Sequence, residues 1–271
     1  MLTLRGAHLV RIVVLLAAGL IPLVARASCI PVAELQPRFI PANYRVADVP
    51  PGSIHLTFLG HATFLIETSG GATAVTDYNG YIRPPFLPDL VTMNNAHSTH
   101  FTDVVEPQIE YVLRGWGTAE QPVHYNLTVK DLHVYNVQTN VRDWSGGTRY
   151  NGNSIFVFES AGLCIAHLGH LHHSLTDAHL AAIGKVDVVL VPVDGVFTMG
   201  QFDMIETIQQ LKAPLIIPMH FFGPGRLQRF LERLEAETNY KVQMSEQPDV
   251  LVSSATLPPA TAPLVLVLPG H

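Results

Sequence analysis

The chain has 271 residues, of which 48% are hydrophobic and 14% are charged, and its formal net charge is -6. This composition excludes a disordered chain and a coiled coil, and it predicts one mid-sized globular domain or two small ones. The acidic balance, with no cluster of Lys and Arg, argues against a nucleic-acid-binding surface. Histidine is unusually frequent, because 14 His stand beside only 16 Lys and Arg.

The N-terminal segment has the pattern of a signal peptide. A nearly uninterrupted apolar run covers residues 12–24, and small residues follow at cleavage-site spacing. We therefore predict a signal peptide over 1–27, a single domain over 28–271, and export to the periplasm or beyond. The apolar run is shorter than the roughly 20 residues of a membrane span, and no later segment is long enough. Lipid attachment at Cys29 and an uncleaved anchor remain as alternatives.

The chain holds two cysteines, Cys29 and Cys164. An oxidising compartment permits a disulfide between them if the mature N-terminus lies beside the strand that carries Cys164. The alternative is a buried, apolar Cys164 and an unpaired Cys29. Both readings stay open at the level of sequence.

The first part of the chain is rich in predicted strands. Alternating and β-branched runs are separated by Gly, Pro and polar residues, which is typical of a β-meander and longer loops. The expected strands are Ile54–Phe58, Thr63–Glu67, Ala72–Thr76, Leu90–Met93, Ile109–Arg114, Tyr125–Val129, Leu132–Val137, Ser154–Glu159 and Leu163–Ala166.

The second part alternates helices with strands. The strands Val186–Val191 and Pro214–Pro218 are apolar runs, as expected where helices cover a sheet. An edge strand over Leu264–Leu268 would come last. The expected helices are Thr176–Ile183, Phe202–Leu211 and Gly225–Thr238.

Five histidines follow predicted strands. They are His97 and His100 after Leu90–Met93, His167 and His170 after Leu163–Ala166, and His220 after the strand that ends at Pro218. If the carboxyl ends of these strands lie together, the five imidazoles converge on one cleft. Histidine is the commonest transition-metal ligand among side chains, so this pattern favours a metal site. Of the adjacent His172 and His173, at most one can point into that cleft.

Short segments in a fixed order resemble the metallo-β-lactamase superfamily, in its branch of lactonase-like and N-acylphosphatidylethanolamine phospholipase D-like metallohydrolases. The resemblance extends from about Ser53 to Pro224 and implies an αββα four-layer sandwich of the α/β class, with a one- or two-metal site at the sheet edges. The segments that carry it are Leu59-Gly60-His61-Ala62, Val75-Thr76-Asp77, Asn95-Ala96-His97-Ser98-Thr99-His100, Asp143-Trp144-Ser145-Gly146, Ile165-Ala166-His167-Leu168-Gly169-His170, Val186-Asp187 through Pro192, and Ile217-Pro218-Met219-His220.

The metal motif departs from the family pattern H-x-H-x-D-H. Asn95 and Thr99 stand where that pattern has its first His and its Asp, and His170 stands where the family has a bridging Asp. The resemblance implies a first metal position of Asn95, His97 and Asp143, although Arg142 is an alternative alignment. This set is poor in strong ligands, and the charge of Arg142 close by would repel a metal cation. We therefore expect that position to be empty or to bind metal weakly.

The second metal position implied by the resemblance would consist of His100, His170 and His220. Three neutral histidines with an open fourth position are a known catalytic zinc arrangement, so one zinc-like ion is the natural interpretation.

Supporting roles follow from the same alignment. His97 or His167 could act as general base, while Thr99 could only donate or accept a hydrogen bond. We favour for His167 a supporting role, in contact with the metal ligands rather than with the metal or the water. The family positions of Asp77, Asn95 and His61 put them beside the ligands, where a carboxylate would orient an imidazole.

The leading hypothesis is an exported metal-dependent hydrolase that acts on a small molecule with an ester, lactone or phosphodiester bond. A catalytically degenerate metal- or ligand-binding module of the same fold is the alternative, and a redox-active iron, copper or manganese protein is a third possibility. β-Lactam hydrolysis is not implied.

Overall fold

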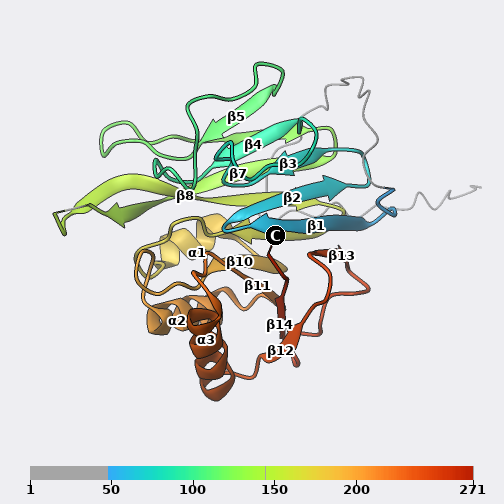
Figure 1. Cartoon of the computed structure of the whole chain (residues 1–271), viewed down its shortest axis with the longest axis vertical. Coiled ribbons are helices and arrows are strands. Elements are labelled where there is room, and N and C mark those ends of the chain that lie inside the picture. The colour runs from blue at the N-terminus through green and yellow to red at the C-terminus, as the bar shows by residue number, and fades with distance from the viewer. Residues whose placement is uncertain (1–47, 144, 271) are drawn as a thin grey trace, which may run out of the picture.

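The structure is a computed structural model that describes residues 48–143 and 145–270 (Figure 1). The predicted signal peptide, the alternatives for the anchor and the pairing of Cys29 with Cys164 therefore lie outside the described residues. Within the described part of the chain, no helix is both long and apolar enough to cross a bilayer.

The first sheet has six strands in the order β13-β1-β2-β3-β4-β5. Strands β1, β2 and β3 form the expected antiparallel meander, whereas β3, β4 and β5 run parallel, so the carboxyl ends of β3 and β4 meet at one edge. The strands are β1 Ser53–Gly60, β2 Thr63–Thr68, β3 Thr73–Val75, β4 Leu90–Met93, β5 Tyr111–Arg114 and β13 Asp249–Ser253.

The second sheet has eight strands in the order β12-β14-β11-β10-β9-β8-β7-β6. Strands β9, β10, β11, β14 and β12 are parallel to one another, so the carboxyl ends of β9, β10 and β11 share an edge. The strands are β6 Asn126–Val129, β7 Leu132–Arg142, β8 Thr148–Ser160, β9 Leu163–His167, β10 Val188–Pro192, β11 Leu215–Met219, β12 Lys241–Met244 and β14 Leu264–Val267.

Three helices cover the face of the second sheet that points away from the first: α1 Asp177–Ile183, α2 Gln201–Leu211 and α3 Pro224–Glu237 (Figure 1). Their buried side chains, such as Ile205 and Phe230, form one core with that face. A second core, which includes Phe64 and Phe158, fills the space between the sheets. The two packed sheets and this helical layer agree with the predicted αββα sandwich, and loops form the remaining outer layer.

The outer face of the first sheet is covered by loops in the described residues. Tyr78 and Ile109 pack there against Val75, Val91 and Met93, and they come from the segments that follow β3 and precede β5. The histidine-bearing turn after β4 continues into the second of these loops, so the covering layer and the candidate site share one segment of chain.

The expected elements are present, with three differences at the edges. Strands β12 and β13 were not predicted, because both are short and largely solvent-accessible and lack a clear apolar pattern. The strand predicted over Leu264–Leu268 is present as β14, but its predicted place at the edge of the sheet is wrong. It lies between β11 and β12 and has three buried residues. Strand β7 continues to Arg142, and β8 starts at Thr148, because the two form a long hairpin.

His55 links three strands of the first sheet through charge. Its Nδ1 lies 2.9 Å from Glu67 of β2 and its Nε2 lies 2.8 Å from Asp249 of β13. The hydrogen bond with Glu67 is the main cause that raises the pKa of His55 to about 9. The ring is therefore a cation at neutral pH.

The variant His55→Gln is expected to be less stable than the parent by about 1 kcal/mol at pH 6.5, a modest value because the group is partly solvated. Because the pKa of His55 is higher in the folded than in the unfolded state, its ion pairs stabilise the folded state fully below about pH 6.5. This contribution is lost as the pH rises through 9. Urea unfolding of both proteins between pH 6 and 10 measures the difference in their free energies of unfolding. An unchanged difference at pH 10 would contradict the ion-pair assignment.

Candidate metal centre

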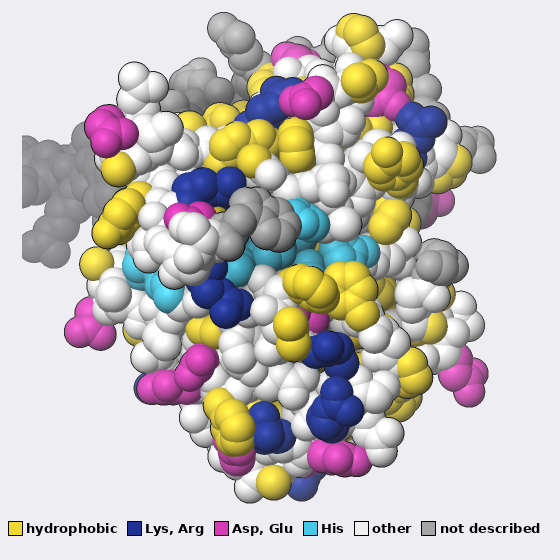
Figure 2. All heavy atoms as spheres, turned by 60° about the vertical axis from the view of Figure 1, so that its left-hand side comes forward, with side chains coloured by type: hydrophobic (Ala, Val, Ile, Leu, Met, Phe, Trp, Pro, Cys, Tyr) yellow, Lys and Arg dark blue, Asp and Glu magenta, His cyan; other side chains and the backbone are white. Residues whose placement is uncertain are grey.

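Five histidine side chains meet where the strand ends of the two sheets face each other. Figure 2 shows His side chains as a row across this face of the molecule, with hydrophobic side chains along one side of the row. They form two groups that share His100, and in each group the possible ligand atoms lie within 4.8 Å of one another. The groups are His61, His100 and His220, and His97, His100 and His170.

His100 is held by a buried carboxylate. It follows β4, and its Nδ1 lies 2.6 Å from Oδ2 of Asp77, which follows β3; neither side chain is exposed. The other oxygen of Asp77 accepts a hydrogen bond from the backbone N of Asn94. Burial raises the pKa of Asp77 to about 6. Because Nδ1 of His100 donates to Asp77, the lone pair of its Nε2 faces the cluster.

His220 has the same arrangement on the second sheet. It follows β11, and its Nδ1 lies 3.1 Å from Oδ1 of Asp194, which follows β10. Asp194 also accepts from the backbone N atoms of Val196, Phe197 and Thr198. Burial alone would raise the pKa of Asp194, but the hydrogen bonds from His220 and its own loop hold it well below the ordinary range.

Asp194 was not among the predicted site residues. It follows the apolar strand β10, as the selected histidines follow theirs, but only histidines were considered at strand ends.

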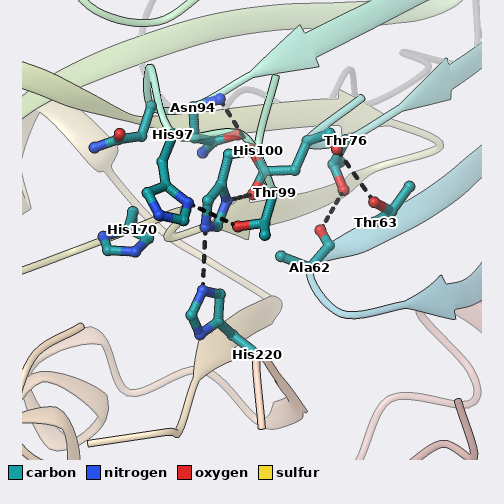
Figure 3. A network of polar contacts seen from close by, with 12 residues as sticks. Ala62, Thr63, Thr76, Asn94, His97, Thr99, His100, His170 and His220 are labelled. Atoms are coloured by element: carbon teal, nitrogen blue, oxygen red, sulfur yellow. Dashed lines mark hydrogen bonds and ion pairs between the residues drawn. The ribbon is translucent and has the colours of Figure 1, made fainter. Parts of the chain in front are cut away.

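The Nε2 atoms of His100 and His220 lie only 3.1 Å apart (Figure 3). Each ring donates its Nδ1 hydrogen to a carboxylate, so two lone pairs point at each other unless a cation stands between them. A four-coordinate zinc with bonds of about 2.0–2.1 Å to imidazole needs two ligand nitrogens about 3.3 Å apart. The observed separation fits such an ion.

His61 supplies a third nitrogen. Its Nε2 is buried and has no hydrogen-bond partner among the described residues, and its ring centroid lies 4.2 Å from that of His220. Burial, together with the neighbouring His220 and His100, lowers the pKa of His61 to about 3, so the ring is neutral. A buried, neutral and unpaired imidazole nitrogen beside two others is a suitable metal ligand.

The backbone at this point is unusual. His61 and His220 have φ angles of 53° and 55°, in the left-handed region that few non-glycine residues adopt, and the N of His220 donates to the carbonyl of His61 at 2.6 Å. This contact between the sheets holds the two rings side by side. Strain of this kind typically marks functional sites.

The structure therefore groups the predicted ligands differently from the expected triad. His61, which the alignment placed beside the ligands, stands with His100 and His220, whereas His170 stands with His97 and His100. Nδ1 of His97 contacts Thr99 Oγ1 at 3.0 Å, which leaves Nε2 for the site. Burial lowers the pKa of His97, so this ring is neutral near pH 7.

His167 lies behind the cluster. Its Nε2 contacts the carbonyl of Ala62 at 2.8 Å, and its Nδ1 accepts from the backbone N of Gly169. Both ring nitrogens are occupied by backbone groups, so His167 fixes the turn that carries His170. Such a ring is not free to take a proton from a water.

The predicted ligand Asp143 does not join either histidine group. The carboxylate of Asp143 is exposed and accepts from Ser145 and Gly147 within its own turn. Asn95 is buried and accepts from Arg149 at 3.3 Å. Of the two alternatives at this point of the alignment, Arg142 is the one that contacts a histidine, because its Nε donates to His172, which in turn lies against His170.

Exposed apolar side chains border the histidines. The Phe222 ring lies 5.3 Å from His220 and 5.5 Å from His61, and Phe197 packs edge-on against Phe222. Phe197, Phe222 and Val196 are each exposed by half or more. Large apolar side chains exposed as a group commonly mark a binding surface.

Comparison with known proteins places these features in a family. Residues 55–220 match the model of the beta-lactamase superfamily domain. A metal-dependent hydrolase of Methanoculleus marisnigri is 26% identical over 217 residues, which is 70% of this chain and 93% of that protein. A metal-dependent hydrolase of Salinibacter ruber is 28% identical over 193 residues, 61% of this chain and 84% of its own length.

Solved structures agree with the fold. A candidate zinc-dependent hydrolase of the metallo-beta-lactamase superfamily from Thermotoga maritima has a TM-score of 0.55 and 29% identity, and the match covers 80% of this chain and all of that one. A metallo hydrolase from Ignicoccus hospitalis has 17% identity and a TM-score of 0.53. The match covers 81% of this chain and 97% of that one and shows the shared fold. The family model spans every strand and turn that carries the five histidines, and the chain belongs to the metallo-β-lactamase branch of the beta-lactamase superfamily.

Proposed function

We propose that this protein is an exported metal-dependent hydrolase that binds one zinc-like divalent ion and cleaves an ester, lactone or phosphodiester bond of a small molecule. The relatives described as metal-dependent hydrolases support the reaction class. The signal-peptide pattern of residues 1–27 supports export, which the N-terminal sequence of protein recovered from the periplasm would test.

The single observation that carries the proposal is the 3.1 Å separation of the His100 and His220 Nε2 atoms. Each atom lies opposite an Nδ1 bound to a buried carboxylate, which is the usual support of a metal-ligating imidazole. His61 completes the donor set, because its buried Nε2 has no partner in the described residues. Imidazole nitrogens are ligands that zinc accepts readily.

A zinc ion held by His61, His100 and His220 would supply Lewis acidity and would lower the pKa of an attacking water to about 7. The chain's own groups do the remaining work. Asp77 and Asp194 hold the ring orientations of His100 and His220. His97 is neutral and half-buried, and in the tautomer whose Nδ1 donates to Thr99 its Nε2 can accept a proton from water.

Metal content and hydrolysis measured on the same preparation test this proposal. We expect about one equivalent of zinc per chain and turnover of at least one substrate in a panel of esters, lactones and phosphodiesters. Metal without turnover would favour the binding-module alternative. A coloured or redox-active preparation would favour the iron, copper or manganese alternative.

The apolar border should decide which substrates bind well. For the variant Phe222→Ala, KM for a substrate with an apolar acyl or aryl group is expected to rise by about tenfold, since burying an aromatic side chain against a ligand contributes about 1.5–3 kcal/mol when complete. KM for a small polar analogue should change little, and Phe202→Ala, which removes an exposed aromatic from α2, serves as control. Equal increases in KM for both substrates would contradict a role in substrate selection.

A further inference from the structure

A chain of three side chains leads from the β7–β8 hairpin into the site. Nε of Arg142 donates to Nδ1 of His172 at 3.1 Å, and Nε2 of His172 lies 2.6 Å from Nδ1 of His170. The two ring planes are inclined by 26° and their centroids lie 4.7 Å apart, so the facing nitrogens can form a hydrogen bond close to the ring planes. His170 in turn lies beside His97 and His100 (Figure 3).

The direction of this chain is fixed by arginine. A guanidinium has only donors and stays charged in proteins, so Nδ1 of His172 must offer its lone pair to Arg142. The one ring hydrogen of His172 is then on Nε2 and is donated to Nδ1 of His170. Nδ1 of His170 is therefore an acceptor, and the hydrogen of that ring is on Nε2.

Both ends of the chain are anchored. Nη2 of Arg142 also donates to the carbonyls of Val196, at 3.1 Å, and Thr198, at 2.8 Å. The backbone N of His170 donates to the buried Oδ1 of Asn153 at 2.8 Å. Gly169 has a φ of 58°, and a Cβ there would lie 2.4 Å from Asn94, so this turn is closely packed.

The resulting proton arrangement of His170 is opposite to that of His100 and His220. Those two rings donate through Nδ1 to Asp77 and Asp194 and present lone pairs to the cluster. His170 accepts through Nδ1 and presents an N–H. An N–H cannot coordinate a metal, because coordination needs the nitrogen lone pair.

We propose that His170 is a hydrogen-bond donor of the site rather than a metal ligand, held in this state by His172 and Arg142. Its role in the reaction rests on the proposed function: Nε2–H binds the substrate oxygen that gains negative charge as the carbonyl or phosphoryl group is attacked. The positioning residues are Arg142 and His172. In the metallo-β-lactamase pattern a bridging Asp stands at the position of His170, so this chain has a hydrogen-bond donor where that pattern has a carboxylate.

The proton position can be read directly by long-range 1H–15N correlation spectra of zinc-loaded protein labelled with 15N-histidine. The His170 signals are assigned from their loss in His170→Gln. We expect a protonated Nε2 and an unprotonated Nδ1 for His170. A protonated Nδ1, or a zinc-bound Nε2, would overturn the proposal.

Zinc affinity and turnover separate the donor role from a ligand role. His170→Gln and His170→Leu should bind zinc within about twofold of the parent. On a substrate of the parent enzyme, kcat should fall on the order of 10²-fold in His170→Leu, the effect of removing one oxyanion donor, and partly recover in His170→Gln, whose amide N–H can replace Nε2–H. Loss of zinc from both variants would overturn the proposal.

Arginine substitutions test the origin of the proton arrangement. Arg142→Met removes the donor that fixes His172, so the proton of His170 is expected to redistribute towards Nδ1 in the same spectra. Arg149→Met removes a charge of the same hairpin that also lowers the pKa of His172 but is hydrogen-bonded to Asn95 instead, and it should leave the proton of His170 on Nε2. Equal spectra for the parent and Arg142→Met would overturn the relay. A parent protein with protonated Nε2 that hydrolyses nothing would support the proton arrangement and contradict only the proposed function.

Discussion

Replacing His100 with alanine is expected to abolish metal binding and to lower hydrolysis by on the order of 10³-fold or more. His100 belongs to both histidine groups and faces His220 at 3.1 Å, so no other single substitution removes as many possible metal contacts. The effect should exceed the roughly 10- to 100-fold loss of affinity that follows from removing a supporting hydrogen-bond partner. Zinc per chain and the rise of Tm on adding zinc measure it, because a ligand that binds only the folded state raises Tm.

A second variant separates the loss of a ligand from the loss of the fold. His100→Asn can keep a donor to Asp77 near the position of Nδ1 but has no counterpart of Nε2. It should fold, fail to bind zinc and show no zinc-dependent rise of Tm. His124→Ala, at an exposed histidine, should behave as the parent does. Normal zinc binding by His100→Asn would show that the ion is held elsewhere.

The fold was largely predictable because its central strands are apolar and its turns are marked by Gly, Pro and polar residues. Strands such as β10 and β11 are buried along their whole length, so hydrophobicity alone locates them. Strands β12 and β13 have no such pattern. Their backbone pairing with β14 and β1 stabilises them, and pairing partners distant in sequence leave no local signal.

The sequence predicted which histidines lie in the candidate site better than it predicted the contacts between them. The strand-end rule found His97, His100, His170 and His220, because parallel strands bring their carboxyl ends to one edge. It could not show that a contact between the sheets brings His61 beside His220. The proton on each ring depends on partners such as Asp194 and Arg142, whose positions follow from the three-dimensional arrangement.

Asp194 is expected to contribute to metal binding without touching the ion. In the variant Asp194→Asn, Nδ1 of His220 loses its carboxylate partner, and the amide can accept fewer of the hydrogen bonds that organise the loop 195–198. Zinc affinity should fall by roughly 10- to 100-fold, as for other carboxylates that support a ligating histidine. Competition with a chelator measures the affinity.

The control for this substitution lies at the other end of the same strand. Asp187 precedes β10, is buried to a similar degree, and accepts from the backbone N of Cys164 far from the histidines along the strand. Asp187→Asn should lower stability without changing zinc affinity, whereas Asp194→Asn should change both. If the two variants lose zinc affinity equally, the effect comes from general loosening of the sheet. A selective loss in Asp194→Asn would show that the carboxylate acts through His220.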